Sequence, residues 1–283
     1  MKYRDKVLTN KIMMTTLSLL LLYASAHYWH HSTPNPAETA ETAETAANVI
    51  GDPTFPNGYK KTHVWVGDRT KKELQYLHRS HGQSHSKYNQ DMTILKLFRG
   101  KRNGTFIDLA ANQAYKLSNT FMLERDLNWS GLCVDSNYNV WSELATRKCT
   151  VVAAAVGKFM NEEIPLRFRT KAGKASIRET AYTVTLNSLF ERFHLPPTID
   201  YFSFHFEVAD TYVLESFNWK NYKFNVISIE QSKASLFGET FDQQGYFYLL
   251  TLGNEEIWIH KTFLSEEAAR SLADLNPESL KTI

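Results

Sequence analysis

Five titratable residues at or near the ends of strand-like runs are the part of this 283-residue sequence best suited to chemistry. These residues are Asp108, Asp135, His205, Glu207 and Glu230. In an open α/β sheet, the carboxyl ends of the parallel strands meet at one edge, which is where ligands bind. Carboxylates at that edge can accept hydrogen bonds from ribose hydroxyls, and a histidine can accept a proton near neutral pH. The positions of the five residues therefore predict a shared ligand site.

The turn that follows the first of these acids is built from small residues. Its members are Ala110, Ala111, Asn112 and Ala114. Small residues let the backbone approach a ligand, and the N-terminus of a following helix favours a negative or polar group. Dinucleotide-binding folds usually have glycines where this chain has Ala110 and Ala114. An α/β core whose acids merely end strands is the competing interpretation of this spacing.

Strand-like and helix-like segments alternate along the chain, which predicts right-handed crossovers and a mostly parallel sheet. Strands are expected at 105–109, 131–135, 150–156, 166–170, 199–207 and 224–230, with a closing pair at 246–252 and 256–260. Helices are expected at 71–77, 91–99, 115–127, 138–146, 184–193, 209–217 and 234–242. The predicted fold class is thus α/β and Rossmann-like, with an antiparallel strand at the end of the sheet.

The composition suits one packed α/β domain with appendages. Hydrophobic residues make up 43% of the chain and aromatic residues 13%. The 32 basic and 30 acidic side chains nearly cancel, so no nucleic-acid partner is expected.

A basic and then apolar N-terminal segment indicates entry into the secretory pathway. Lys2, Arg4, Lys6 and Lys11 precede an uncharged run at 12–29. That run is either a signal peptide cleaved near Ala24-Ser25-Ala26, or a signal anchor of about 27 Å. We favour the anchor, which makes a type II membrane protein, because a long tether follows. Both interpretations place the rest of the chain in the lumen of the endoplasmic reticulum or Golgi, and cleavage would make the protein secreted.

The sequence divides into four parts by composition. Residues 1–29 form the cytoplasmic tail and membrane segment, and residues 30–62 a disordered stem rich in Pro and Ala-Glu-Thr repeats. Residues 63–100 are a helical lead-in, and residues 101–283 are the α/β domain.

Histidines and cysteines receive structural interpretations. His78, His81 and His85 have a spacing that could ligate a metal, but Gly82 and the neighbouring serines favour a solvated loop, and no metal site is expected. Cys133 and Cys149 fall at the second and third predicted strands. A disulfide is possible in an oxidising lumen, but two buried free thiols are favoured here.

Two further features are candidates for modification or substrate binding. Asn103-Gly104-Thr105 and Asn128-Trp129-Ser130 match the N-glycosylation acceptor pattern, and both adjoin predicted strands. The basic segment 167–178 is a candidate lid over an acceptor.

Polar residues share one side of the predicted strand at 199–207. Alternation places Ser203, His205 and Glu207 on one face and three phenylalanines on the other. Because buried polar groups need partners, His205 and Glu207 are expected at the carboxyl end of this strand.

An ordered set of short segments resembles the FkbM-type methyltransferase family, most closely its algal and protist branch. The segments are Ser86–Asp91, Gly100–Asn112, Leu117–Thr120, Trp129–Asp135, Thr185–Leu189, Ile199–Ser203, Glu207–Ala209 and Ile227–Glu230. The resemblance spans residues 84–262 and implies a seven-stranded class I fold. It also implies binding of S-adenosylmethionine and methylation of a hydroxyl, often on a sugar.

The resemblance also implies roles for individual residues. Asp108 and the turn 110–114 would hold the methionine part of the cofactor, and Asp135 the ribose hydroxyls. Glu207 would correspond to the acid of the family's Asp-x-Glu-Gly segment, and Glu230 to the acid that ends the fifth strand. His205 and Val208 depart from that segment, as do Gln113 and the pair Asp135-Ser136 elsewhere.

Two functions of different class follow. The first is a lumenal, membrane-tethered O-methyltransferase for a glycan or other small hydroxylated acceptor, in which His205 or Glu207 removes the acceptor proton. The second is a catalytically inactive relative that keeps the fold as a binding or interaction module.

Overall fold

The computed structural model describes residues 63–66, 82–169, 176–205 and 212–276. These ranges all belong to one compact unit, residues 50–283. The expected membrane segment at 12–29, the stem at 30–62 and Glu207 lie outside the described residues. Within the described ranges, no helix has the length and apolar character needed to cross a bilayer.

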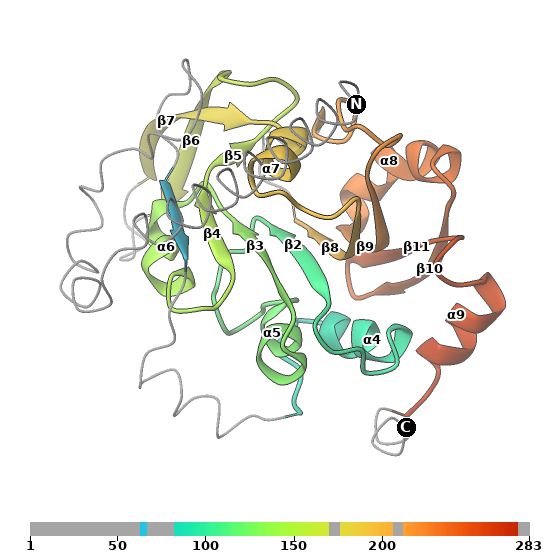
Figure 1. Ribbon diagram of the computed structural model, residues 1–283. Helices are drawn as coiled ribbons and strands as arrows, with labels where there is room; N and C mark the ends of the chain where they lie inside the picture. Colours follow the sequence, from blue (N-terminus) through green and yellow to red (C-terminus); the bar gives the residue numbers. More distant parts are fainter. Residues whose placement is uncertain (1–62, 67–81, 170–175, 206–211, 277–283) are drawn as a thin grey trace, which may run out of the picture. The chain divides into compact units, whose positions relative to one another are not determined.

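A twisted eight-stranded sheet forms the centre of the described unit (Figure 1). Its strands are β1 (His63–Val66), β2 (Thr105–Leu109), β3 (Ser130–Val134), β4 (Thr150–Ala153), β8 (Thr198–Phe204), β9 (Lys223–Glu230), β10 (Tyr246–Leu252) and β11 (Glu255–His260). Their spatial order is β1-β4-β3-β2-β8-β9-β11-β10. The five strands from β4 to β9 in this order are parallel, whereas β1 and β11 pair with their parallel neighbours in the antiparallel sense. The expected mostly parallel α/β sheet is therefore confirmed.

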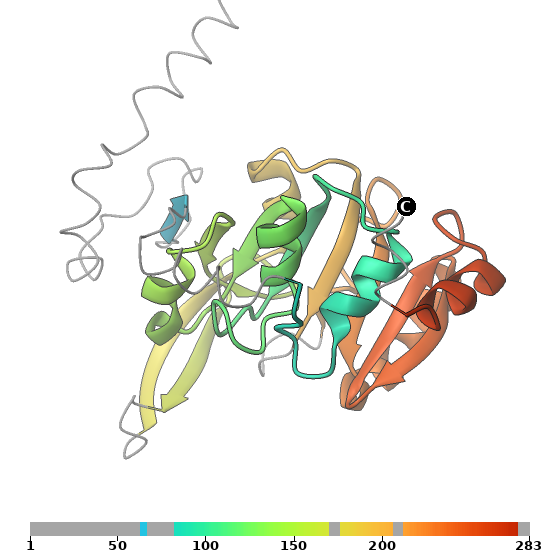
Figure 2. The same ribbon diagram turned by 90° about the horizontal axis from the view of Figure 1, so that it is seen from below.

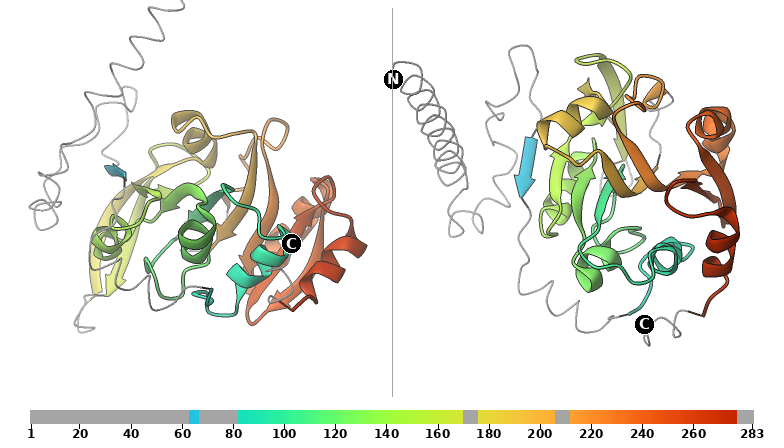
Figure 3. Two further views of the ribbon diagram at one scale, coloured as in Figure 1. Left: turned by 60° about the horizontal axis from the view of Figure 1, so that its bottom comes forward. Right: turned by 45° about the vertical axis from the view of Figure 1, so that its right-hand side comes forward.

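Helices cover both faces of this sheet because its strands are apolar on both sides. The helices are α4 (Gln90–Leu97), α5 (Phe121–Leu127), α6 (Tyr138–Leu144), α7 (Leu186–Arg192), α8 (Gln231–Gln243) and α9 (Glu266–Ala273). One hydrophobic core contains side chains of α7 and α8, and the other contains side chains of α4, α5, α6 and α9. α4 and α9 lie side by side on the second face (Figure 3). α4 is thus an integral part of the fold although it precedes the first parallel strand.

A second, three-stranded sheet departs from the sequence-based prediction. It consists of β5 (Ala155–Val156), β6 (Glu163–Arg169) and β7 (Ser176–Val184), with β7 in the middle. The β6–β7 pair extends beyond the main sheet (Figure 2). The candidate lid at 167–178 therefore includes the end of β6 and the start of β7, which pair in the antiparallel sense.

Three other boundaries differ from the expected ones. The strand expected at 150–156 is split between β4 and β5 by Ala154. The helix expected at 115–127 begins only at Phe121, after a long turn. Where a helix was expected at 209–217, residues 212–217 form turns, and Val213, Leu214 and Phe217 still pack into the core. These apolar side chains are thus buried as their pattern predicts, although the backbone there does not form the expected helix.

Candidate functional site

The order of strand connections creates a crevice beside β2. The chain runs from β2 to β3 and β4 on one side, and then returns to place β8 and β9 on the other side. Because the connections leave β2 in opposite directions, a crevice is expected beyond the carboxyl ends of β2 and β8. A cavity of about 170 Å³ lies there, lined by Asp108, Ala110, Ala111, Asn112, Leu117, Asn119 and His205.

A larger hollow of about 490 Å³ lies elsewhere, between α4, β10 and α9. Its wall contains Lys96, whose Nζ atom already donates a hydrogen bond to the Ala273 carbonyl. The smaller cavity is the better candidate site, because the titratable side chains of Asp108 and His205 converge on it.

The turn after β2 holds two residues in the left-handed conformation. The φ angles are 57° at Ala110 and 53° at Asn112. This region favours glycine, so the alanine at 110 adopts the conformation for which related folds use a glycine. Ala111 N–H donates to the Val134 carbonyl, and this bond ties the turn to β3. Ala114 is fully buried in the core and does not line the cavity.

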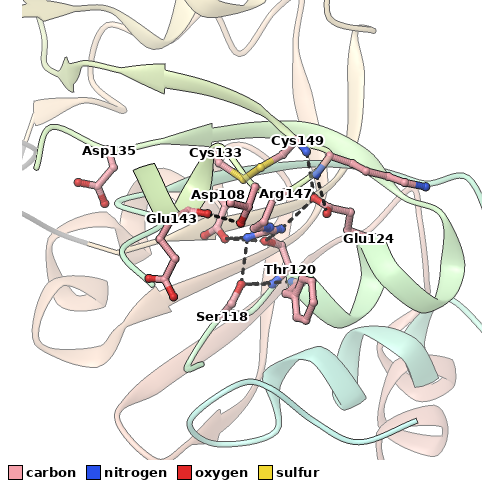
Figure 4. Close-up of a disulfide and its surroundings, with 12 residues drawn as sticks. Asp108, Ser118, Thr120, Glu124, Cys133, Asp135, Glu143, Arg147 and Cys149 are labelled. Carbon is pink, nitrogen blue, oxygen red and sulfur yellow. Dashed lines mark hydrogen bonds and ion pairs between the residues drawn. A yellow bond between two sulfur atoms is a disulfide. The ribbon is translucent and has the colours of Figure 1, made fainter. Parts of the chain in front are cut away.

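Asp135 supports that turn from the neighbouring strand. Its Oδ2 atom accepts a 2.7 Å hydrogen bond from the Asn112 N–H, and its Oδ1 atom accepts one of 2.7 Å from the Asn137 N–H. The side chain does not line the cavity, and Figure 4 shows it apart from the group around Asp108. The carboxylate expected to bind ribose therefore holds the turn in this structure.

Asp108 lies between the cavity and a buried polar cluster under α5. Its Oδ2 atom accepts a 2.6 Å hydrogen bond from the Thr120 hydroxyl, and the residue is 2% exposed. Burial raises the pKa of Asp108 above its usual value, although the charges of Arg147 and His205 and the Thr120 hydroxyl oppose that rise. The carboxyl group is thus more easily protonated than an exposed aspartate.

Arg147 occupies the centre of the buried cluster (Figure 4). Its side chain is fully buried, with Nη2 3.2 Å from Glu124 Oε2 and Nη1 3.9 Å from Asp108 Oδ2. It also donates hydrogen bonds to the hydroxyls of Ser118 and Thr120. Thr120 therefore bridges the arginine and the Asp108 carboxyl. Sequence reasoning missed this arginine, because it lies outside the strands, in the segment before β4.

The prediction of two free thiols is wrong, because Cys133 and Cys149 form a disulfide (Figure 4). Cys133 is paired with Val151 across β3 and β4, and Cys149 lies two residues before Val151. The two side chains consequently face the same side of the sheet, with Cα atoms 5.9 Å apart, a separation suited to a disulfide. The Cys149 N–H donates to Glu124, so the disulfide adjoins the Arg147 cluster.

His205 follows β8 and forms the other wall of the cavity. Its N–H donates to the Leu109 carbonyl, which continues the pairing of β8 with β2. Its Nε2 atom lies 2.9 Å from Glu255 Oε1, and its side chain is 33% exposed. Burial lowers the pKa of His205, but the hydrogen bond and negative charge of Glu255, together with Asp108 and Glu230, outweigh it and raise the pKa above 6.5.

Glu255 is a site residue that the sequence-based prediction missed. It is the first residue of β11, which runs antiparallel to β9, so this amino-terminal end reaches the same edge as the carboxyl ends of the parallel strands. Asn119 Nδ2 donates to its Oε2 atom. Burial raises the pKa of Glu255, but the partners His205, Gln90 and Asn119 prevail and lower it below 4.5. In the sequence, only the expected antiparallel direction of the last strand could have indicated that this residue lies at the site.

The turn before Glu255 is fixed by a close contact. Gly253 has a φ angle of 62°, and a Cβ atom there would lie 2.3 Å from the ring of Tyr88. Only glycine fits this position, so the segment before α4 holds the β10–β11 turn and hence Glu255 in place.

The two remaining predicted site residues are Glu207 and Glu230. Glu207 lies outside the described residues. Glu230 ends β9 as expected, is half-buried, and accepts a hydrogen bond from Asn254 Nδ2. It does not line the cavity, but it pairs with Glu255 across the β9–β11 ladder.

His85 is buried rather than solvated, which corrects the prediction for this part of the histidine-rich segment; His78 and His81 lie outside the described residues. Its Nδ1 atom lies 2.9 Å from the Tyr115 carbonyl oxygen and its Nε2 atom 2.9 Å from Arg125 Nη1. The histidine is therefore neutral, with Nδ1–H donating and Nε2 accepting. Across the described ranges, no group of three or more His, Cys, Asp or Glu side chains could hold a metal ion.

The arrangement at the cavity is suited to proton transfer. The His205 ring lies between two side chains. Its Nδ1 atom is 3.4 Å from Ser203 Oγ, and its Nε2 atom is 2.9 Å from Glu255 Oε1. Ser203 is fully buried and does not line the cavity, so its hydroxyl is not placed there as a nucleophile. The partly exposed imidazole of His205, supported by a buried carboxylate, can instead accept a proton from a bound hydroxyl.

No family model matches the chain, and no curated protein matches it at a significant level. The functional proposal below therefore rests on the sequence resemblance described above and on the geometry of this site.

Proposed function

We propose that this protein is an S-adenosylmethionine-dependent O-methyltransferase that acts on a sugar hydroxyl or a similar small hydroxylated acceptor. The observation that carries the proposal is the cavity between β2 and β8, where the His205–Glu255 pair faces the Ala110–Asn112 turn. The strand order β4-β3-β2-β8-β9-β11-β10, with β11 antiparallel, is compatible with the seven-stranded class I methyltransferase fold that the sequence resemblance implies.

The walls of the cavity fit one portion of the cofactor. The left-handed turn brings backbone close to the cavity, and Asp108 presents a carboxyl group beside it. At about 170 Å³, the cavity is smaller than the ~300–1,000 Å³ of sites that enclose whole drug-sized ligands, so the described residues would hold only part of a nucleoside cofactor. In this proposal Asp108 and the turn contact the cofactor, and Asp135 keeps the turn in position.

The chemistry required of the protein is mainly alignment and proton removal. S-adenosylmethionine would supply an electrophilic methyl group. The protein must align the acceptor oxygen with that group and exclude water. His205 would accept the proton that the acceptor hydroxyl loses, and Glu255 would stabilise the resulting imidazolium.

The proposed location is the secretory lumen, where the sequence favours an anchored, type II membrane orientation. The Cys133–Cys149 disulfide supports an oxidising compartment, since such bonds are rare in the cytosol. The glycans and small hydroxylated metabolites of that compartment would be the acceptors.

Calorimetric titration of the oxidised full-length chain with S-adenosylmethionine and its demethylated product tests cofactor binding. We expect saturable binding that Asp108→Ala abolishes, whereas Asp242→Ala, which removes an exposed acid on α8, leaves it unchanged. An acceptor screen with labelled methyl donor then tests catalysis. His205→Ala should lower the transfer rate by about 10²–10⁴-fold, as expected for loss of a general base, while cofactor binding persists.

A second candidate function is a binding or interaction module without catalysis. The small cavity and the engagement of Asp135 with two backbone N–H groups favour it. Failure to bind the cofactor at millimolar concentration would leave only this second function.

A further inference from the structure

The two N-glycosylation acceptor motifs lie against each other in the structure. Asn128 Nδ2 donates a 2.7 Å hydrogen bond to Asn103 Oδ1, although 25 residues separate the two asparagines. Both asparagines are exposed, and both have left-handed φ angles, 56° at Asn103 and 57° at Asn128. The two possible attachment points therefore share one patch of surface.

The middle residues of the two motifs lock this arrangement. Gly104 packs against the ring of Trp129 so closely that a Cβ atom would lie 2.4 Å from it. The Ser130 N–H donates to the Gly104 carbonyl, and the Asn103 N–H donates to the Leu127 carbonyl. Trp129 is 1% exposed and its indole N–H donates to the Lys101 carbonyl. The two loops are thus a rigid unit that holds both asparagine side chains in place.

This unit lies at the opposite edge of the sheet from the cavity. Asn103 and Asn128 precede the amino ends of β2 and β3, whereas the cavity residues lie at and beyond their carboxyl ends. A five-residue strand separates the two edges by about 17 Å. A large polar modification there would leave the cavity open.

We propose that the folded protein carries one N-linked glycan in this unit, on Asn103, and that Asn128 stays unmodified. In the hydrogen bond between the two side chains Asn103 accepts through Oδ1, so the bond does not use its Nδ2 atom, whereas Asn128 uses Nδ2 as the donor. A sugar on Asn128 Nδ2 would occupy the space in which Asn103 sits. The proposal rests on the lumenal location proposed above, but not on methyl transfer.

Attachment takes place before this part of the chain folds, and the folded contact acts afterwards: a chain that carries a sugar on Asn128 Nδ2 cannot form the hydrogen bond to Asn103 and does not complete this part of the fold. In the folded protein the Asp200 N–H donates to the Thr105 hydroxyl, so the acceptor motif is no longer available to a transferase. The co-reactant is an oligosaccharide carried on a lipid pyrophosphate. A bond forms between sugar C1 and Asn103 Nδ2, the bond from C1 to phosphate oxygen breaks, and one Nδ2 proton is released as the lipid pyrophosphate leaves.

Expression of the full-length chain behind a cleavable secretion signal in a eukaryotic cell tests the proposal. Molecules that are protected from added protease inside sealed membranes are selected first, which restricts the measurement to chains that entered the lumen. Trypsin then separates the two motifs, because cleavage after Arg102 and Arg125 places them on different peptides. Mass spectrometry before and after glycosidase treatment reports the occupancy of each asparagine.

Matched variants show whether the acceptor motif itself, rather than a change in the fold, determines the modification. Thr105→Ala should remove the modification from residue 103, whereas Thr105→Ser, which keeps the hydroxyl, should retain it. Ser130→Ala destroys the second motif without changing Asn128 and should leave the glycan content unchanged. Protected wild-type chains that carry no glycan, that carry it on Asn128 alone, or that carry glycans on both residues in the disulfide-bonded fraction would overturn the proposal.

Discussion

Glu255 Oε1 lies 2.9 Å from His205 Nε2, although 50 residues separate the two side chains along the chain. The pair is formed by strands of opposite direction, β8 and β11, and is supported by Asn119. Each partner shifts the pKa of the other toward the charged form, which outweighs the effect of burial on both. The hydrogen-bonded His205–Glu255 pair is therefore the main electrostatic feature of the candidate site.

Removal of the Glu255 charge should lower the pKa of His205. Glu255→Gln keeps the size of the side chain but removes the negative partner that stabilises the imidazolium. A pH titration of the His205 ring by NMR should show this fall. Because the base must be neutral, methyl transfer should rise with pH through the His205 pKa, and this rise should move to lower pH in the variant. Glu256→Gln, one residue along β11, is the control, and an equal shift in that variant would contradict the assignment.

Loss of the Arg147 side chain should destabilise the protein strongly. Arg147→Met leaves Glu124 and Asp108 buried without their cation, which costs about 3–5 kcal/mol in comparable cases. Urea denaturation measures the change. Arg147→Met combined with Glu124→Gln should recover part of the loss, because one buried negative charge is removed as well.

The exposed ion pair of Arg270 with Glu266 provides the control for Arg147. Arg270→Met should cost less than about 1 kcal/mol, since exposed pairs contribute little. Similar losses of unfolding free energy in the two arginine variants would show that burial does not determine how much the Arg147 cluster contributes to stability.

Reduction of the disulfide should lower stability by about 3 kcal/mol. The Cys133–Cys149 bond closes a loop with a sequence separation of 16 residues, and a loop near this length constrains the unfolded chain by about that amount. The free energy of unfolding in urea is measured with and without reductant. The double variant Cys133→Ala, Cys149→Ala should resemble the reduced protein and show no response to reductant.

Glycine at position 110 should stabilise the fold. Ala110 has a φ angle of 57°, where a non-glycine residue carries a penalty of about 1–2 kcal/mol. The greater flexibility of glycine in the unfolded chain offsets about 0.4–1 kcal/mol of that gain, so Ala110→Gly should add about 0.5–1 kcal/mol. Ala111→Gly, next in the same turn, has no left-handed φ to relieve and should destabilise. Thermal unfolding of the two variants should therefore move in opposite directions.

Mild acid should weaken the segment before α4 through His85. Burial lowers the pKa of His85, and the neighbouring Arg125 lowers it further, against the opposing effects of the Tyr115 carbonyl and of Asp91 and Asp126. The folded pKa lies below the ordinary value of 6.5, so this contribution to stability is complete above pH 6.5 and is lost as the pH falls toward the folded pKa. Urea midpoints measured between pH 7.5 and 5 should fall less steeply for His85→Gln. Parallel slopes in the wild type and the variant would exclude His85 as the cause.

The core strands could be predicted from the sequence because their signals are local. Strands were expected at 105–109, 246–252 and 256–260, and the structure has strands at nearly the same residues. The turn at Ala110 was located for the same reason, since small residues interrupt two apolar segments. These features depend on residues close together in the chain.

The rest of the site depends on relations between distant segments. Glu255 belongs to the site only because β11 runs against β9, and Arg147 only because its side chain passes under α5. The disulfide requires the register of β3 and β4, in which Cys133 faces Val151. Asp135 was placed correctly at the end of its strand, but the direction of its side chain toward Asn112 depends on a turn 23 residues earlier.

The late position of β11 in the sequence also sets the order in which the site can be completed during synthesis. Cys133 and Cys149 leave the ribosome more than a hundred residues before Glu255, so their covalent bond can form while His205 still lacks its partner. A chain interrupted between these points would hold the Asp108 wall of the crevice but no His205–Glu255 pair opposite it. Ribosome-bound fragments that end before β11 should therefore differ from those that end after β11 in the pKa of the His205 imidazole.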